Sequence, residues 1–227
     1  MTNPLLHQHA APWLVIESST ARGSVALVAG GRVLESRSVA LRAREVERLM
    51  PAVADAMASA GLVATDLAGV VCGSGPGSFT GLRIGGGIAK GIVHATSCPF
   101  YAVPSLLLLA AAAAARDGRG RYLASADAMR DDRFVLLAEC DAEGKVTRRD
   151  SAPMLPMAAL APLAAAEGAR IVAPGEDDLW PDAAAVVLLA DGVIGPVPVA
   201  TWEPTYGRLA EAQVKWEIAH GRPLPLS

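Results

Sequence analysis

The chain has 227 residues and a formal net charge of −3, and 52% of its residues are hydrophobic while 19% are charged. This composition excludes bulk disorder and supplies a sizeable core, enough for one large domain or two small ones. The slightly acidic balance argues against a chain that grips nucleic acid by itself, because such chains carry an excess or a patch of basic residues.

The first half of the chain alternates strand and helix signals. A buried strand is expected at 13–16, and a hairpin follows whose strands, 23–29 and 32–39, flank Gly30 and Gly31. Apolar residues at helical spacing predict a helix over 46–60, which Gly61 ends. The remaining elements of this half are expected as a strand at 67–72, a loop and helix at 73–96, a strand at 100–103 and a helix at 105–116.

Part of this order repeats after residues 116–120, which have the composition of a linker. Segments 14–28 and 123–137 align without gaps, each with a strand, a polar turn, an arginine and a second strand. A third strand, an alanine-rich helix at 157–167, a strand at 169–173 and a final helix at 203–220 are expected to follow. The repeat predicts an α/β chain with a duplicated βββαβα unit, which resembles the plan of the actin-like superfamily (ASKHA, ribonuclease H-like). The expected domains are 1–116, joined by 203–220, and the smaller 121–202.

The most unusual stretch is 73–91, GSGPGSFTGLRIGGGIAKG. Its predicted helix carries Gly81, Gly85, Gly86, Gly87 and Gly91, and each helical glycine costs roughly 1 kcal/mol relative to alanine. Close contacts must offset this cost, because glycine lets a backbone approach a sheet, a ligand or another helix. We expect the helix to pack on its own sheet on one side and on another helix or subunit on the other.

The loop that precedes this helix fits no specific phosphate fingerprint. It lacks the Lys-Ser or Lys-Thr pair of a P-loop, the third glycine of a dinucleotide fold and the GxSxG of a nucleophile elbow. A generic anion site at a helix N-terminus remains, and Ser78 or Thr80 either caps the helix or touches a phosphate. If the two domains face each other across a cleft, the candidate nucleotide residues are Glu17, Ser18, Gly75, Gly77, Ser78 and Asp127.

The same stretch resembles the G-x-GPGSFTGLRIG-x-x-x-AKG signature of the TsaB (YeaZ) family. IESST at 16–20, ERLMP at 47–51, DAMR at 127–130 and PTYGR at 204–208 resemble further motifs of that family. The resemblance implies the actin-like fold and a non-catalytic, cytoplasmic partner of the catalytic paralogue TsaD. With the ATPase TsaE, such a partner supports transfer of threonylcarbamoyl to adenosine 37 of tRNA, which it meets only through the complex.

The resemblance also implies where the partner binds. Contact with TsaD, or with a second copy of the chain in a homodimer, is expected through helices 46–60 and 80–96. The expected interface residues are Val46, Leu49, Met50, Val53, Leu82, Gly85, Gly86, Ala89 and Val93. On this basis Gly85→Leu or Gly86→Arg should abolish partner binding in a folded monomer, whereas substitution of Gly81 should disturb folding.

Several features argue against an enzyme. The four histidines form no His-x-x-x-His pair of the kind with which the paralogue holds its metal, and Cys72, Cys98 and Cys140 are too widely spaced for a zinc site. No signal peptide or membrane span is expected, since the longest apolar run is short. Glu17 and Met129 replace an aspartate and an arginine of the family motifs. No cofactor is therefore expected, and weak binding of a nucleotide is left as an alternative. The rival hypothesis is an ATP-using transferase or a peptidase with a nucleotide or metal site in the cleft.

Overall fold

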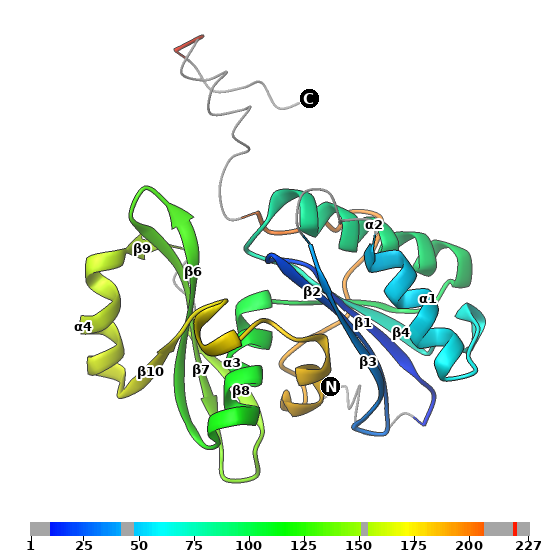
Figure 1. The fold of residues 1–227 in the computed structure, drawn as a ribbon, viewed down its shortest axis with the longest axis horizontal. Coiled ribbons are helices and arrows are strands. Elements are labelled where there is room, and N and C mark those ends of the chain that lie inside the picture. Colours follow the sequence, from blue (N-terminus) through cyan, green and yellow to red (C-terminus); the bar gives the residue numbers. More distant parts are fainter. Residues whose placement is uncertain (1–9, 42–47, 151–153, 207–219, 222–227) are drawn as a thin grey trace.

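The computed structural model describes residues 10–41, 48–150, 154–206 and 220–221, which form two lobes (Figure 1). The N-terminal lobe contains a mixed five-stranded sheet in the order β3-β2-β1-β4-β5. β1 pairs antiparallel with β2 and parallel with β4, and β4 pairs parallel with β5. The strands are β1 (Trp13–Glu17), β2 (Arg22–Ala29), β3 (Arg32–Ala40), β4 (Gly69–Gly73) and β5 (Phe100–Val103).

Helices cover both faces of this sheet. α1 (Leu49–Ser59) and α2 (Phe79–Thr96) pack on one face, against alternate residues of β1 such as Leu14 and Ile16. A short 3-10 turn, η2 (Ala64–Asp66), lies between α1 and β4, and α3 (Ser105–Asp117) covers the opposite face. The whole of β1 is buried because it is covered on both sides, which explains its uninterrupted apolar sequence.

The C-terminal lobe has a smaller sheet in the order β10-β6-β7-β8, with β9 paired to β7. α4 packs on its outer face against Leu123 and Val135. The elements are β6 (Gly120–Met129), β7 (Asp132–Cys140), β8 (Val146–Asp150), β9 (Leu155–Pro156), α4 (Met157–Glu167), β10 (Ala169–Val172), η3 (Glu176–Asp178) and η4 (Ala183–Leu188).

α3 and η4 lie between the two sheets and join them in one core (Figure 1). This core contains Trp13 and Val15 of β1 as well as Tyr122 and Ala124 of β6. α3 is almost entirely buried, from Leu106 to Ala114, because it belongs to a core that includes side chains of both sheets. The region around α3 and η4, between the two sheets, is therefore filled by side chains of the chain itself.

The duplication expected from the sequence is present. β6, β7, β8, α4 and β10 repeat the order and sheet positions of β1, β2, β3, α1 and β4. The second copy is shorter, because the 3-10 helices η3 and η4 follow β10 where the long helix α2 follows β4 in the first copy. Both aligned segments form a hairpin, but Leu14 pairs with Leu27 whereas Leu123 pairs with Leu137. The second hairpin is therefore one residue longer, and the gapless alignment is wrong by one residue between its two strands.

Two expectations about the chain's organisation need correction, and one of them falls partly outside the described residues. Arg116 and Asp117, expected in the linker, belong to α3, so only residues 118–119 connect it to β6. Residues 203–206 are not helical, and the rest of the helix expected at 203–220 lies almost wholly outside the described residues. All three cysteines are free thiols. Among the helices that the structure describes, none combines the length and apolar character needed to cross a membrane.

Candidate functional site

The glycine-rich stretch forms a loop over residues 74–78 and then helix α2. Ser78 is the N-cap of α2, and its hydroxyl oxygen accepts a hydrogen bond from the backbone N–H of Gly81 at 3.2 Å. Of the two roles considered for this serine, the structure thus shows capping. The backbone N–H of Ser78 donates to the carbonyl oxygen of Ser19 at 2.7 Å, which holds the loop against the β1–β2 turn.

Three glycines of this stretch are required by close packing against Ser18 and Ser19 of the β1–β2 turn. A Cβ atom added to Gly77 would collide with the carbonyl oxygen of Ser19, and one added to Gly81 would collide with that of Ser18. A Cβ atom added to Gly85 would collide with the Ser18 hydroxyl. The inner ridge of α2 therefore lies directly on the β1–β2 turn, and the expectation that substitution of Gly81 disturbs folding stays a prediction, with the Ser18 carbonyl oxygen as its physical reason.

The C-terminal part of the chain covers a second side of α2. The ring of Trp202 lies 3.2 Å from the Cβ position of Gly86, and Pro204 lies 3.7 Å from it. Lys90 forms an ion pair with Glu203 at 3.2 Å, which holds the same segment. We call residues 197–206 the strap, because they run from the second lobe back across α2.

Only two glycines of α2 are free of such contacts. Nothing in the described part of the chain lies within 4 Å of a Cβ atom added to Gly87 or Gly91, and both residues are exposed. They stand four residues apart, so they lie on the same face of the helix. Met50 of α1, with 49% of its surface exposed, is a large apolar residue on the neighbouring helix.

These positions correct the choice of interface residues made from the sequence. Leu49, Val53, Leu82, Ala89 and Val93 are buried within the N-terminal lobe, Gly85 lies on Ser18, and Gly86 lies under the strap. Val46 lies outside the described residues, and Met50 alone of the predicted set is exposed. Apolar periodicity identified the face that each helix turns to its own sheet. The pair Gly87 and Gly91 was visible in the sequence as a second small-residue spacing, but nothing there distinguished it from the buried ridge.

Most of the residues predicted for a nucleotide site do come together, around the carboxyl group of Glu17. This side chain is fully buried at the end of β1. One carboxylate oxygen accepts the Ser19 N–H at 2.6 Å, and the other accepts the Ser105 hydroxyl at 2.8 Å. The Ser105 hydroxyl in turn accepts the Gly75 N–H at 3.1 Å. Burial raises the pKa of the Glu17 carboxyl above its ordinary value, although the hydrogen bonds from Ser19 and Ser105 oppose the rise.

The loop in front of Glu17 is occupied by the chain itself. The Thr205 N–H donates to the Ser74 carbonyl oxygen at 2.7 Å, and the Thr205 carbonyl oxygen lies where a Cβ atom of Gly75 would stand. Ser18 is buried beneath α2, and its hydroxyl has no hydrogen-bond partner among the residues that the structure describes. The glycine at position 75 therefore accommodates the backbone of the strap.

Asp127 does not belong to this cluster. It is exposed at the end of β6, and its carboxylate accepts the Met129 N–H at 2.8 Å within the β6–β7 turn. It forms no hydrogen bond or ion pair with Glu17 or the 74–78 loop among the residues described. The same part of the chain contains no group of three or more His, Cys, Asp and Glu side chains placed to hold a metal ion.

A cavity of about 330 Å³ lies between the lobes, on the side of β2 and β3. Arg22 and Asp178 form an ion pair across it at 3.0 Å, and Trp180 donates its indole N–H to Asp178 at 3.0 Å. Its lining consists of Arg22, Ser24, Ser38, Ala112, Asp178, Leu179, Trp180, Pro181 and Asp182. The cavity is at the small end of the range for ligand pockets, and its arginine is already paired.

Comparison with known proteins gives three kinds of similarity. Residues 40–143 match the family model of TsaD, tRNA N6-adenosine threonylcarbamoyltransferase. The chain is 37% identical over 115 residues to the tRNA threonylcarbamoyladenosine biosynthesis protein TsaB of Escherichia coli, which covers 51% of this chain and 49% of that protein. The chain thus spans about half the length of this curated relative.

Solved structures are similar over nearly the whole chain. YeaZ from Pseudomonas aeruginosa is 25% identical with a TM-score of 0.69, covering 86% of this chain and 99% of that one. A second structure, of an uncharacterized protein with similarity to peptidase YeaZ from Pseudomonas aeruginosa, is 27% identical with a TM-score of 0.72, covering 87% of this chain and 100% of that one. This likeness includes both lobes and confirms the actin-like fold expected from the sequence.

Proposed function

Because the chain belongs to the TsaB (YeaZ) family, we propose that it acts in tRNA N6-threonylcarbamoyladenosine biosynthesis as a non-catalytic subunit. In this role it binds the catalytic paralogue TsaD through the N-terminal lobe and works with the ATPase TsaE in the cytoplasm. tRNA reaches it only within the complex. The names of its relatives support the pathway, and the geometry of α2 supports the manner of binding.

The observation that carries the proposal is the open pair Gly87 and Gly91. The other glycines of α2 are matched by contacts within the chain, whereas these two cost roughly 1 kcal/mol each without any such contact. A partner helix laid on this face could approach more closely than the usual 8–10 Å between helix axes. Met50 on α1 offers a further exposed apolar side chain in the same lobe. The same face would serve a homodimer of the free chain.

The surroundings of Glu17 support a non-catalytic role. The N–H groups of Ser19, Gly75 and Ser78, which a phosphate would need, all donate to groups of the chain itself. The Glu17 carboxylate is engaged by two donors and covered by the 74–78 loop. Tight binding of a nucleotide here would require these hydrogen bonds to break.

The test is co-purification with TsaD from the same organism. Gly87→Leu and Gly91→Leu place a large side chain on the open face, so we expect TsaD binding to weaken roughly tenfold or more, which is about 1.4 kcal/mol. The matched control is Ala166→Leu, which adds an exposed leucine to α4 of the other lobe. Light scattering with and without ATP gives the mass of each species, and circular dichroism verifies folding. Unchanged binding by folded Gly87→Leu and Gly91→Leu variants would count against this interface.

The alternative is an enzyme with a nucleotide or metal site between the lobes, and the cavity near Arg22 and Trp180 is the observation that favours it. Calorimetric titration of the isolated chain with Mg-ATP separates the two functions. Micromolar affinity together with turnover would favour the enzyme, and weak or absent binding would favour the non-catalytic subunit.

A further inference from the structure

The two lobes are connected by a linker of two residues, Gly118 and Arg119. Gly118 has a φ of 82° and Gly120 a φ of 151°, values that glycine adopts far more readily than other residues. A connection of this kind between lobes has the composition of a hinge, since hinges are short segments that absorb changes in φ and ψ.

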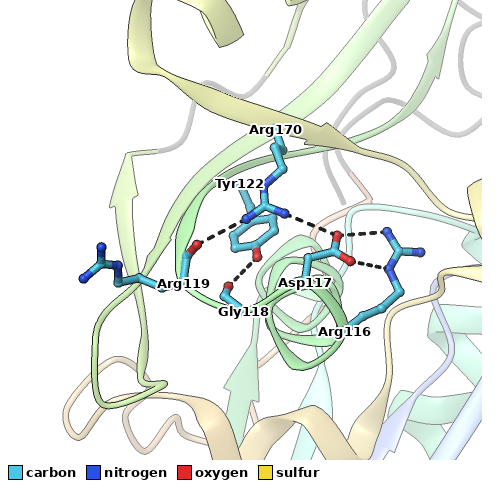
Figure 2. A network of polar contacts seen from close by, with 6 residues as sticks. All are labelled: Arg116, Asp117, Gly118, Arg119, Tyr122 and Arg170. Atoms are coloured by element: carbon cyan, nitrogen blue, oxygen red, sulfur yellow. Dashed lines mark hydrogen bonds and ion pairs between the residues drawn. The ribbon is translucent and has the colours of Figure 1, made fainter.

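Side chains of the second lobe hold both carbonyl groups of this linker (Figure 2). The hydroxyl of Tyr122, on β6, donates to the Gly118 carbonyl oxygen. The guanidinium group of Arg170, on β10, donates to the Arg119 carbonyl oxygen at 3.2 Å. Arg170 and Tyr122 are directly paired between β10 and β6. Both hydrogen bonds to the linker therefore come from neighbouring positions of the same sheet.

Arg170 also joins the linker to the end of α3. Its guanidinium group lies 3.8 Å from the Asp117 carboxylate and 5.0 Å from the centre of the Tyr122 ring. Asp117 is in turn held by Arg116 through two hydrogen bonds of 2.8 and 3.0 Å (Figure 2). We call Asp117, Tyr122 and Arg170 the latch.

Further contacts link the lobes away from the linker. The Ala183 N–H donates to the buried Ser24 hydroxyl oxygen at 2.8 Å, and Arg22 of β2 pairs with Asp178 at 3.0 Å. Together with the core that both sheets share around α3, these contacts oppose rotation of one lobe relative to the other.

We infer that the two lobes form one rigid body, and that the latch holds the glycine linker so that the space between the lobes does not open and close. The inference concerns the isolated chain and does not depend on the proposed partner. A rigid chain presents α1 and α2 at a fixed angle to the second lobe, whereas enzymes that close around a ligand need a mobile hinge.

The distance between spin labels on the two lobes tests this inference. Cysteines replace the exposed residues Ala58 on α1 and Ala166 on α4, in a Cys98→Ser background, since Cys72 and Cys140 are buried. Pulsed electron resonance on the full chain should give one narrow distance distribution, and saturating Mg-ATP should leave it unchanged. A broad or two-peaked distribution, or a shift with Mg-ATP, would overturn the rigid body.

Latch variants test the role of the named side chains. Tyr122→Phe removes only the hydroxyl, and Arg170→Gln changes an exposed side chain, so both should fold. The double variant should broaden the distance distribution at least twofold and increase tryptic cleavage after Arg119. The control Arg149→Gln removes an exposed ion pair with Glu139 elsewhere in the same sheet and should change neither. A double variant as narrow and as resistant as the unaltered chain would refute the latch.

Discussion

The carboxylate of Glu17 and the hydroxyl of Ser105 lie 2.8 Å apart, so residues 88 positions apart in sequence join the end of β1 to the first turn of α3. The family motif has aspartate at this position, and its carboxylate would lie roughly one carbon–carbon bond, about 1.5 Å, further back. The longer side chain of Glu17 therefore explains how this chain reaches Ser105. Its role in the structure is to connect β1, α3 and the glycine loop.

Ser105→Ala should destabilise the chain by about 1–3 kcal/mol, because it leaves both a Glu17 oxygen and the Gly75 N–H buried without their partner. Urea unfolding of the two proteins measures this difference. The control is Ser36→Ala, on the exposed strand β3, which should change the unfolding free energy by less than about 0.5 kcal/mol. Equal stabilities of the two variants would contradict the role assigned to Ser105.

Glu17→Gln should change how stability depends on pH. Burial raises the pKa of Glu17 in the folded chain, so the folded state binds its proton more tightly than the unfolded state does. Glu17 therefore contributes fully to the free energy of unfolding below its pKa in the unfolded chain, which is about 4.3. This contribution is lost as pH rises through the pKa of Glu17 in the folded chain. Glutamine does not ionise in this range. As pH rises from 5 toward 8, the melting temperature of the Glu17→Gln variant should therefore increase relative to that of the unaltered chain. Parallel melting curves across this range would show that Glu17 does not titrate in this way.

Two alanine substitutions in α2 should have opposite effects. Gly81→Ala places a methyl group against the Ser18 carbonyl oxygen, and we expect it to destabilise the chain by roughly 2–3 kcal/mol, as overpacking does. Gly87→Ala meets open space and should stabilise the chain by up to about 1 kcal/mol through helix propensity. Chemical denaturation of both variants measures the difference. A destabilised Gly87→Ala chain would mean that this face is already packed in the isolated protein.

The elements themselves were predictable because their signals are local. Alternation and turn glycines identified the β2–β3 hairpin, where Gly30 and Gly31 have φ of 55° and 71°. Helical spacing of apolar residues identified α1, and Gly61, with a φ of 67°, follows its end as expected. The duplication was visible because the order of strand and helix signals in residues 14–28 recurs in residues 123–137.

The open face of α2 was not predictable, because the spacing of glycines in the sequence does not show which neighbour each glycine meets. Gly85 and Gly87 differ by two positions, yet the first lies on Ser18 and the second meets open space. The difference arises from the β1–β2 turn, about 70 residues earlier, and from the strap more than 100 residues later. Likewise, the sequence did not show that Glu17 accepts a hydrogen bond from Ser105, which lies 88 residues later.

Trp202 should stabilise α2 from outside the helix, and this can be tested together with Gly86. Its ring lies over Gly86 and stands edge-on to Phe100 at 4.9 Å, with Lys90 5.8 Å from its centre. Because the side chain is half-buried, Trp202→Ala should cost roughly 2–3 kcal/mol, below the cost for a fully buried tryptophan. Trp202→Phe keeps an aromatic contact and should cost less.

Gly86→Leu, alone and combined with Trp202→Ala, completes a double-mutant cycle between these two residues. In the unaltered chain the leucine would have to displace Trp202, and we expect a loss of about 1–3 kcal/mol. In the Trp202→Ala background the same leucine enters the vacated space, so most of that loss should vanish, giving a coupling of at least about 1 kcal/mol. Urea unfolding of the four proteins measures it. Equal costs in both backgrounds would mean that the strap does not cover Gly86 in solution, and that this glycine is open to a partner in the same way as Gly87.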